Sequence, residues 1–169
     1  GGRSLSLSNH YSEVNENVMA YSLDGHRHLP EISQELNQLQ EKQSKPLNIT
    51  FLTHLVPMTR GIMSSCYVPL KETISGKKDI KKFVNEIYQD FYSNSPFTKI
   101  VESPPMTKQT LGSNTCLIYP TVDLRTNRLI VISCIDNLIK GTAGQAVQSM
   151  NIMCGFEETT GLTNLAIYP

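Results

Sequence analysis

The sequence lacks an excess of charge of either sign. Its 169 residues include 15 Lys and Arg and 15 Asp and Glu, so the formal net charge is zero. A neutral chain has no general electrostatic field that attracts nucleic acid or an anionic membrane. We therefore expect neither of these classes of partner.

Long apolar runs are also missing. No stretch reaches the roughly 18–20 apolar residues that a membrane-spanning helix needs, and the first residues lack the basic and apolar regions of a signal peptide. These absences predict a cytosolic protein. The length and the 39% apolar content suffice for one domain with one hydrophobic core.

Paired cysteines at metal-binding or redox spacing are the third absence. The four cysteines, none of them in a CxxC motif, are Cys66, Cys116, Cys134 and Cys154. Three of them lie inside apolar segments, where a free thiol behaves as a small hydrophobic side chain. We expect buried free thiols, and a nucleophilic cysteine is the less favoured alternative.

Apolar periodicity predicts an α+β protein. We expect a helix over residues 30–42, a second helix capped by Asp79, and a third that begins near Asn137 and carries an apolar stripe in need of a partner. A hairpin turn is expected over residues 125–127. Extended runs cover residues 18–23, 47–55, 61–70, 97–101, 115–124 and 128–134. Single helices between such runs favour a mixed, mostly antiparallel sheet with helices on one face.

The densest group of chemically capable side chains lies between the first strand and the first helix. His26, Arg27, His28 and Glu31 fall within six residues there. Imidazole titrates near neutral pH, which suits proton transfer. Glu31 is close enough in sequence to orient an imidazole, and it suits equally well the first turn of a helix. A metal-dependent hydrolase that uses both histidines and Glu31, with His54 or His10, is an alternative.

Two further positions combine polar groups with glycine. Arg60 lies in a turn between two apolar strands, where a guanidinium can bind a carboxylate or phosphate with two hydrogen bonds or form a structural salt bridge. Asp136 is expected to cap the last helix. Gly141 and Gly144 in a helical context each cost about 1 kcal/mol relative to alanine. They therefore indicate the close approach of another backbone or of a cofactor.

Three motifs carry a resemblance to a known family. They are HRHLPEI at residues 26–32, HLVPMTRG at residues 54–61 and DNLIKGTAGQA at residues 136–146. In this order, and through nearly the whole chain, the sequence closely resembles N-acetyl-gamma-glutamyl-phosphate reductase, an arginine-biosynthesis oxidoreductase of the semialdehyde dehydrogenase family. The resemblance covers only the C-terminal half of that enzyme. It begins just after the family's catalytic cysteine and lacks the dinucleotide-binding half.

The resemblance implies a fold and a reaction. The fold is that of the C-terminal domain of glyceraldehyde-3-phosphate dehydrogenase, with the free face of the sheet between the subunits of a homo-oligomer. The reaction is the reduction of N-acetyl-glutamyl 5-phosphate to N-acetyl-glutamate 5-semialdehyde with NADPH, through a thioester on a cysteine that this chain lacks. The chain alone would then be inactive. A non-catalytic oligomerisation module is a further alternative.

The resemblance also implies roles for single residues. His26 is the expected acid/base residue, ahead of His28 and supported by Glu31. Asn137 would contact the nicotinamide carboxamide of NADP, a group whose donor and acceptor can form hydrogen bonds with an amide side chain. The expected ligands of the substrate's anionic groups are Arg27, Arg60 and, from the likeness at the first residues, Arg3. Residues 1–135 would form the catalytic and oligomerisation domain, and residues 136–169 would return to the dinucleotide-binding half.

Overall fold

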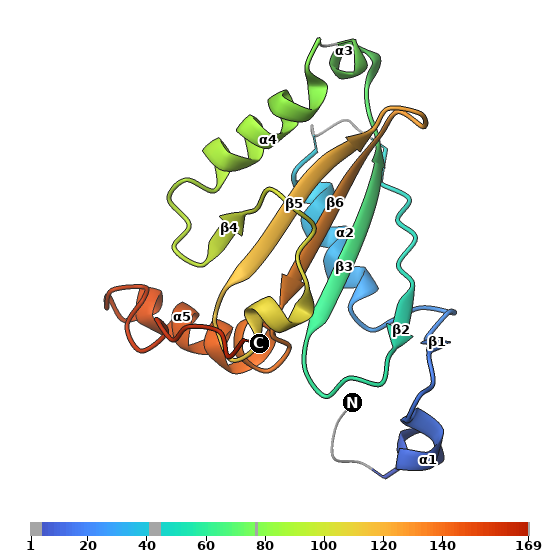
Figure 1. Ribbon diagram of the computed structural model, residues 1–169, viewed down its shortest axis with the longest axis vertical. Helices are drawn as coiled ribbons and strands as arrows, with labels where there is room; N and C mark the ends of the chain where they lie inside the picture. Colours follow the sequence, from blue (N-terminus) through green and yellow to red (C-terminus); the bar gives the residue numbers. More distant parts are fainter. Residues whose placement is uncertain (1–4, 41–44, 77, 169) are drawn as a thin grey trace. The chain divides into compact units, whose positions relative to one another are not determined.

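The computed structural model describes residues 5–40, 45–76 and 78–168. Its elements are labelled in Figure 1. The chain divides into two compact units, Gly1–Met58 and Thr59–Pro169, and each is described by itself. None of the helices within the described ranges is long and apolar enough to cross a membrane.

The first unit contains a two-stranded antiparallel sheet of β1 (Met19–Tyr21) and β2 (Thr53–Leu55). The short helical elements η1 (Leu7–Asn9) and α1 (Tyr11–Val14) precede it. A strand was predicted over residues 47–55, but only the last three of them join the sheet. The reason is that β1 is three residues long and offers ladder hydrogen bonds to no more than three partners.

Helix α2 (Leu29–Gln38) follows β1 and carries proline in its first turn, as predicted. It ends earlier than the predicted residue 42, and residues 41–44 lie outside the described part of the chain. The side chain of Asn37 explains the early end. Its Nδ2 donates to the carbonyl of Ser33 at 2.6 Å, and its Oδ1 accepts from the backbone N–H of Leu47 at 2.8 Å. An asparagine amide that bonds to the backbone competes with the helical hydrogen-bond pattern.

The second unit is built on a four-stranded sheet with the strand order β3-β6-β5-β4. Strands β3 (Ile62–Pro69), β6 (Arg128–Ile135) and β5 (Cys116–Asp123) pair antiparallel. The edge strand β4 (Thr98–Ile100) pairs parallel with β5. This confirms the predicted mixed, mostly antiparallel sheet. The predicted hairpin is the β5–β6 connection, in which Asn127 adopts the left-handed conformation with φ +52°.

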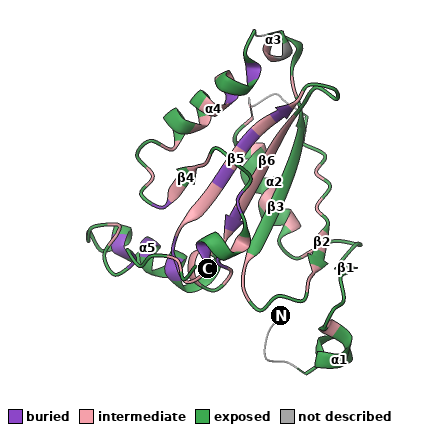
Figure 2. Ribbon diagram, in the orientation of Figure 1, coloured by how far each residue is buried: buried purple, intermediate pink, exposed green. Residues whose placement is uncertain are grey.

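Helix α4 (Ile80–Phe91) covers part of one sheet face (Figure 1). The Asp79 carboxylate accepts from the backbone N–H of Lys82 at 3.2 Å, which confirms the predicted cap. Ile80 and Val84 pack with Val122 of β5 as the buried core, while Lys82 lies on the exposed side. Figure 2 shows this burial along α4 and β5. The short helix α3 (Glu72–Ser75) precedes α4.

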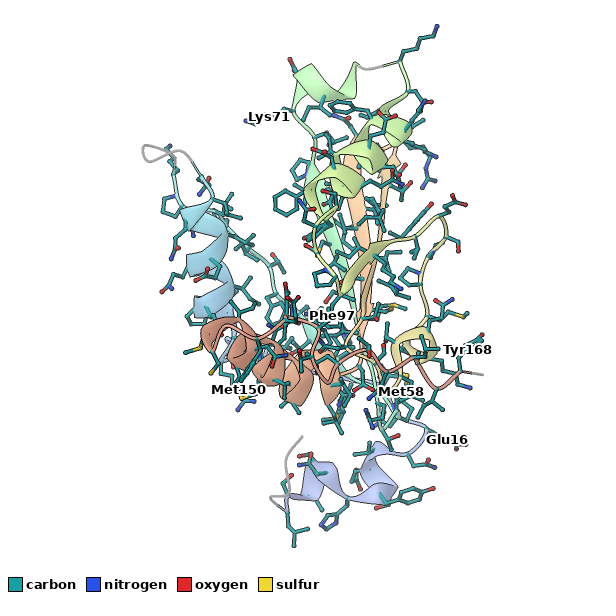
Figure 3. The ribbon with its side chains drawn as sticks, turned by 90° about the vertical axis from the view of Figure 1, so that its left-hand side faces the viewer. Glu16, Met58, Lys71, Phe97, Met150 and Tyr168 are labelled. Carbon is teal, nitrogen blue, oxygen red and sulfur yellow. The ribbon has the colours of Figure 1, made fainter. Side chains whose placement is uncertain are left out.

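The C-terminal part contains η2 (Thr107–Thr110), the π-helical turn η3 (Ile139–Ala143) and α5 (Gly144–Met153). The predicted last helix exists, and its apolar stripe is exposed, as in Val147, Met150 and Met153. The outward position of Met150 is visible in Figure 3. The buried side of α5 is polar instead. On this side Asn151 Nδ2 donates to the carbonyls of Glu158 and Thr160 at 3.2 and 3.0 Å, which satisfies the buried amide.

All four cysteines are free, as expected, but the prediction that they are buried is wrong for two of them. Cys134 is buried and Cys116 is partly buried, whereas Cys66 and Cys154 are exposed. Cys66 is exposed because the whole edge strand β3 is exposed. Burial raises the pKa of the Cys134 thiol to about 11, so this group is an inert part of the core.

Candidate functional site

The first cluster surrounds His26, between β1 and α2. The His26 ring is half-buried and makes edge-to-face contacts with three rings, those of Tyr21, His28 and Phe51, at centroid distances of 5.6, 4.8 and 5.4 Å. Tyr21 ends β1, and Phe51 lies just before β2. The pairing of these strands therefore helps to bring both rings to His26.

One hydrogen bond determines the tautomer of the neutral His26 ring. The backbone N–H of His28 donates to His26 Nδ1 at 3.2 Å. A neutral imidazole has one acceptor and one donor nitrogen, so Nε2 carries the hydrogen. Sequence analysis predicted that Glu31 could orient this ring. The Glu31 side chain is an exposed first-turn acid of α2, the other role that was predicted for it, and forms no hydrogen bond with a residue in the described ranges.

The other two candidates of this cluster are on the surface. Arg27 is exposed and forms no ion pair within the described ranges, and His28 is exposed at the N-terminus of α2. Among the residues that the structure describes, no three His, Cys, Asp or Glu side chains form a group that could hold a metal ion. The ligand set that the metal-dependent hydrolase requires is therefore not assembled among these residues. Arg3, the third predicted substrate ligand, lies outside the described residues.

The second cluster joins Arg60 to Asp136 in the second unit. Arg60 Nε and Nη2 donate to the two carboxylate oxygens of Asp136 at 3.3 and 2.5 Å. The Asp136 side chain is 0% exposed, whereas the Arg60 side chain is 32% exposed. Asp136 also accepts backbone N–H groups from Gly112, Leu138 and Ile139 at 2.6, 2.8 and 3.0 Å. One buried carboxylate therefore ties together three segments of the chain.

These donors determine the charge of Asp136. Burial raises its pKa, but the N–H groups of Gly112 and Ile139, the Arg60 guanidinium and the N–H of Leu138 together hold the pKa below the usual value. The carboxylate is therefore ionised at neutral pH. Asp136 was expected to cap the last helix; its carboxylate accepts the N–H of Ile139, the first residue of η3, but the N-cap position itself is Leu138. The salt bridge that was one of two interpretations of Arg60 is confirmed.

Asn137 is fixed beside this ion pair. Its side-chain oxygen accepts the backbone N–H of Gly61 at 2.7 Å, and its Nδ2 has no partner within the described ranges. Gly61 has φ +109°, and a Cβ at this position would lie 2.8 Å from the Cβ of Thr107. Only glycine satisfies both conditions without strain. Residues 60–61 and 136–137 are thus held together by side-chain and backbone bonds.

The two helical glycines do lie in crowded places, but the neighbours are the carbonyl at the start of the same turn and a side chain, not the predicted second backbone or cofactor. A Cβ on Gly141 would lie 3.3 Å from the Asp136 carbonyl, and one on Gly144 would overlap the side-chain oxygen of Asn114. Asn114 Nδ2 donates to Gln148 Oε1 at 3.0 Å, and Lys140 Nζ donates to the same oxygen at 2.7 Å. This polar group of Asn114, Lys140 and Gln148 could not be predicted from the sequence, because its members are spread over three segments.

Comparison with known proteins identifies the family. The family model described as semialdehyde dehydrogenase, dimerisation domain, matches residues 1–137. Relatives named N-acetyl-gamma-glutamyl-phosphate reductase include those of Dehalococcoides mccartyi, 51% identical over 168 residues, and of Thermoanaerobacter sp., 49% identical over 170 residues. A third, from Pelotomaculum thermopropionicum, is 46% identical over 170 residues. Each alignment covers 99% of this chain and 47% of the relative.

The chain thus spans about half the length of the curated relatives it matches. A crystal structure of aspartate semialdehyde dehydrogenase II complexed with ASA from Vibrio cholerae aligns with a TM-score of 0.45 and 16% identity, over 60% of this chain and 29% of that one. Because the dimerisation-domain model matches most of the sequence, the chain belongs to the semialdehyde dehydrogenase family, as a dimerisation domain.

Proposed function

We propose that the protein containing this chain is an N-acetyl-gamma-glutamyl-phosphate reductase of arginine biosynthesis. It reduces N-acetyl-glutamyl 5-phosphate to N-acetyl-glutamate 5-semialdehyde, in the cytosol. The observation that carries the proposal is the identity of 46–51%, over 99% of the chain, with relatives of that name. This half of the enzyme must supply proton transfer and binding of the substrate's anionic groups. The fixed imidazole of His26 suits the first task, and the fixed guanidinium of Arg60 suits the second.

His26 is the acid/base residue in this proposal. Its ring is fixed by Tyr21, Phe51 and the backbone of His28, whereas the His28 ring is exposed. A catalytic group held in one orientation loses less freedom when the substrate binds. The Nε2–H of His26 is the donor that meets negative charge developing on the thioester oxygen or on the departing thiolate. The cysteine that forms the thioester belongs to the other half of the enzyme.

NADPH, when bound, supplies the hydride. Asn137 is the residue of this chain proposed to contact it, because the Asn137 Nδ2 is free to donate to the carboxamide oxygen while its Oδ1 is engaged by Gly61. The phosphate-binding glycine loop of the cofactor site belongs to the dinucleotide-binding half. Arg60 is the proposed ligand of one anionic group of the substrate, its carboxylate or its phosphate, and the exposed Arg27 is a separate candidate for this role.

We also propose a homo-oligomer with two kinds of contact. The exposed strand β3, which carries Met63 and Tyr67 at 52% and 62% exposure, supports a sheet interface between subunits. The exposed apolar side of α5, with Val147, Met150 and Met153, supports the proposal that residues 136–169 pack against the dinucleotide-binding half. Residues 1–135 then form the catalytic and oligomerisation part.

Substrate specificity tests the proposed function. The whole enzyme is assayed in the oxidative direction with NADP and phosphate, using N-acetyl-glutamate 5-semialdehyde and, separately, aspartate semialdehyde. We expect turnover with the first substrate and a value of kcat/KM at least about 100-fold lower with the second, because the shorter amino aldehyde cannot fill a site that recognises the acetyl group. Preference for aspartate semialdehyde would overturn the proposal.

A further inference from the structure

Arg60 has two edges that can each bind an anion, and one of them is already occupied. A guanidinium has five N–H donors: one on Nε and two on each terminal nitrogen. Asp136 accepts from Nε and Nη2 of Arg60, which uses the Nε/Nη2 edge. The Nη1/Nη2 edge keeps one hydrogen on each of its two nitrogens, and no hydrogen bond within the described ranges uses Nη1. At 32% exposure, the side chain remains partly open to solvent.

Asp136 does not cancel the charge of Arg60 completely. Its two oxygens share their negative charge with the backbone N–H groups of Gly112, Leu138 and Ile139. The carboxylate would therefore remain well solvated by these amides if the guanidinium turned partly toward a second anion. The arrangement holds Arg60 by one edge and leaves its other edge for an external ligand.

The neighbouring residues fix the base of the same arginine. Asn137 Oδ1 holds the backbone N–H of Gly61, and Gly61 packs against Thr107. Asp136 therefore fixes the side chain of Arg60, and Asn137 fixes the backbone of Gly61. A flexible arginine would lose several side-chain rotations on binding an anion, and this arrangement has already restricted them.

We propose that Asp136 is a positioning residue for substrate binding: it orients Arg60 so that the Nη1/Nη2 edge binds a carboxylate or phosphate of the substrate. This inference rests on the proposed function and extends it to a residue that does not touch the substrate. Because the Nε/Nη2 edge is used internally, the Nη1/Nη2 edge is the part of the guanidinium left for a ligand. A lysine in place of Arg60 would offer a single ammonium group. It has no planar edges with which to bind Asp136 and the substrate's anionic group at the same time.

A double-mutant cycle on the whole enzyme tests the coupling. The variants are Asp136→Asn, Arg60→Ala and their combination, and the matched control is Asp123→Asn. Asp123 forms a similar two-bond pair with Arg125, at 3.1 and 3.2 Å, but Arg125 is 88% exposed. We expect Asp136→Asn to raise the KM of N-acetyl-glutamyl phosphate by about 10-fold, the size of effect that follows the loss of one charge-assisted hydrogen bond, here that between Asp136 and Arg60. Asp123→Asn should leave this KM unchanged.

In the Arg60→Ala background, the effect of Asp136→Asn on KM should vanish, because a residue that acts through Arg60 has nothing left to position. A merely structural role would persist in that background and would overturn the inference. If Arg60→Ala itself leaves the substrate KM unchanged, the proposed role of Arg60 in substrate binding fails. The KM of NADPH, measured in all variants, should stay constant.

A measurement without substitution covers the case in which Asp136→Asn does not fold. In arginine-labelled whole enzyme, NMR follows the guanidinium resonances of Arg60 during titration with inorganic phosphate and, separately, with N-acetyl-glutamate. We expect the Nε–H to exchange slowly and to shift little, while the Nη hydrogens shift with the ligand. The ligand that produces the larger shift at equal ionic strength identifies phosphate or carboxylate as the bound group. Loss of the slow Nε–H on addition of either anion would contradict the inference.

Discussion

Gly61 donates its backbone N–H to the side-chain oxygen of Asn137 at 2.7 Å across 76 residues of sequence. This bond holds the turn before β3 against the end of β6, where Asp136 follows. The positive φ of Gly61 and the nearby Thr107 side chain leave no room for a Cβ. The geometry of Arg60 therefore depends on the glycine that follows it.

Gly61→Ala should lower the free energy of unfolding by about 1–3 kcal/mol, because it combines backbone strain with overpacking. Urea denaturation measures the change. The matched control is Gly155→Ala, since Gly155 also has a positive φ, +72°, but nothing lies within 4 Å of its added Cβ. Equal losses in the two variants would show that contact with Thr107 adds nothing to the backbone strain.

His26→Asn in the whole enzyme should lower kcat by a factor of about 10²–10⁴, the usual effect of losing a general acid or base. His28→Asn is the matched control and should lower kcat less, because the His28 ring is exposed while its backbone N–H, which orients His26, is retained. Steady-state kinetics at saturating substrate separates the two. If His28→Asn proves more damaging, the roles of the two histidines must be exchanged.

The ionisation of Asp136 predicts a stability change in acid. Its folded pKa is lower than the unfolded value of about 3.9, so its contribution is complete above that value and disappears as pH falls through the folded pKa. The stability difference between the native chain and Asp136→Asn should therefore shrink below about pH 4. Urea denaturation at several pH values measures it. A difference that stays constant to pH 2 would mean that the charge of Asp136 contributes no stability.

Local signals predicted the elements, and distant contacts determined the site. The helix cap at Asp79 and the turn of the β5–β6 hairpin depend on residues that are close in sequence, and both could be predicted. The pairing of Arg60 with Asp136 spans 76 residues, and no spacing rule connects the two positions. The aromatic contact of His26 with Phe51 likewise depends on the pairing of β1 and β2.

The last helix shows the limit of apolar periodicity. The pattern correctly located α5 and its apolar stripe, but it could not show that the buried side is formed by Gly144, Gln148 and Asn151. The polar side chains of Gln148 and Asn151 are buried there because hydrogen bonds to Glu158 and to the backbone carbonyls of residues 158 and 160 satisfy them. Such pairing depends on the return of the chain after the helix, which sequence pattern does not predict.

The isolated 169-residue chain should not bind NADPH measurably, because the proposed contact from Asn137 is one hydrogen bond and the glycine loop that binds the cofactor phosphates belongs to the other half. Isothermal titration calorimetry measures this directly, with the whole enzyme as the positive control. Micromolar affinity of the isolated chain would show that this half contains a cofactor site of its own.

The phosphate requirement of aldehyde oxidation tests the central claim most directly. The whole enzyme is supplied with NADP and N-acetyl-glutamate 5-semialdehyde, and NADPH formation is followed with and without inorganic phosphate. An acyl-phosphate reductase needs phosphate to release the acyl group from its cysteine, so we predict sustained turnover only when phosphate is present. Equal turnover without phosphate would mean that water releases a free acid. The protein would then be an aldehyde dehydrogenase rather than the proposed reductase.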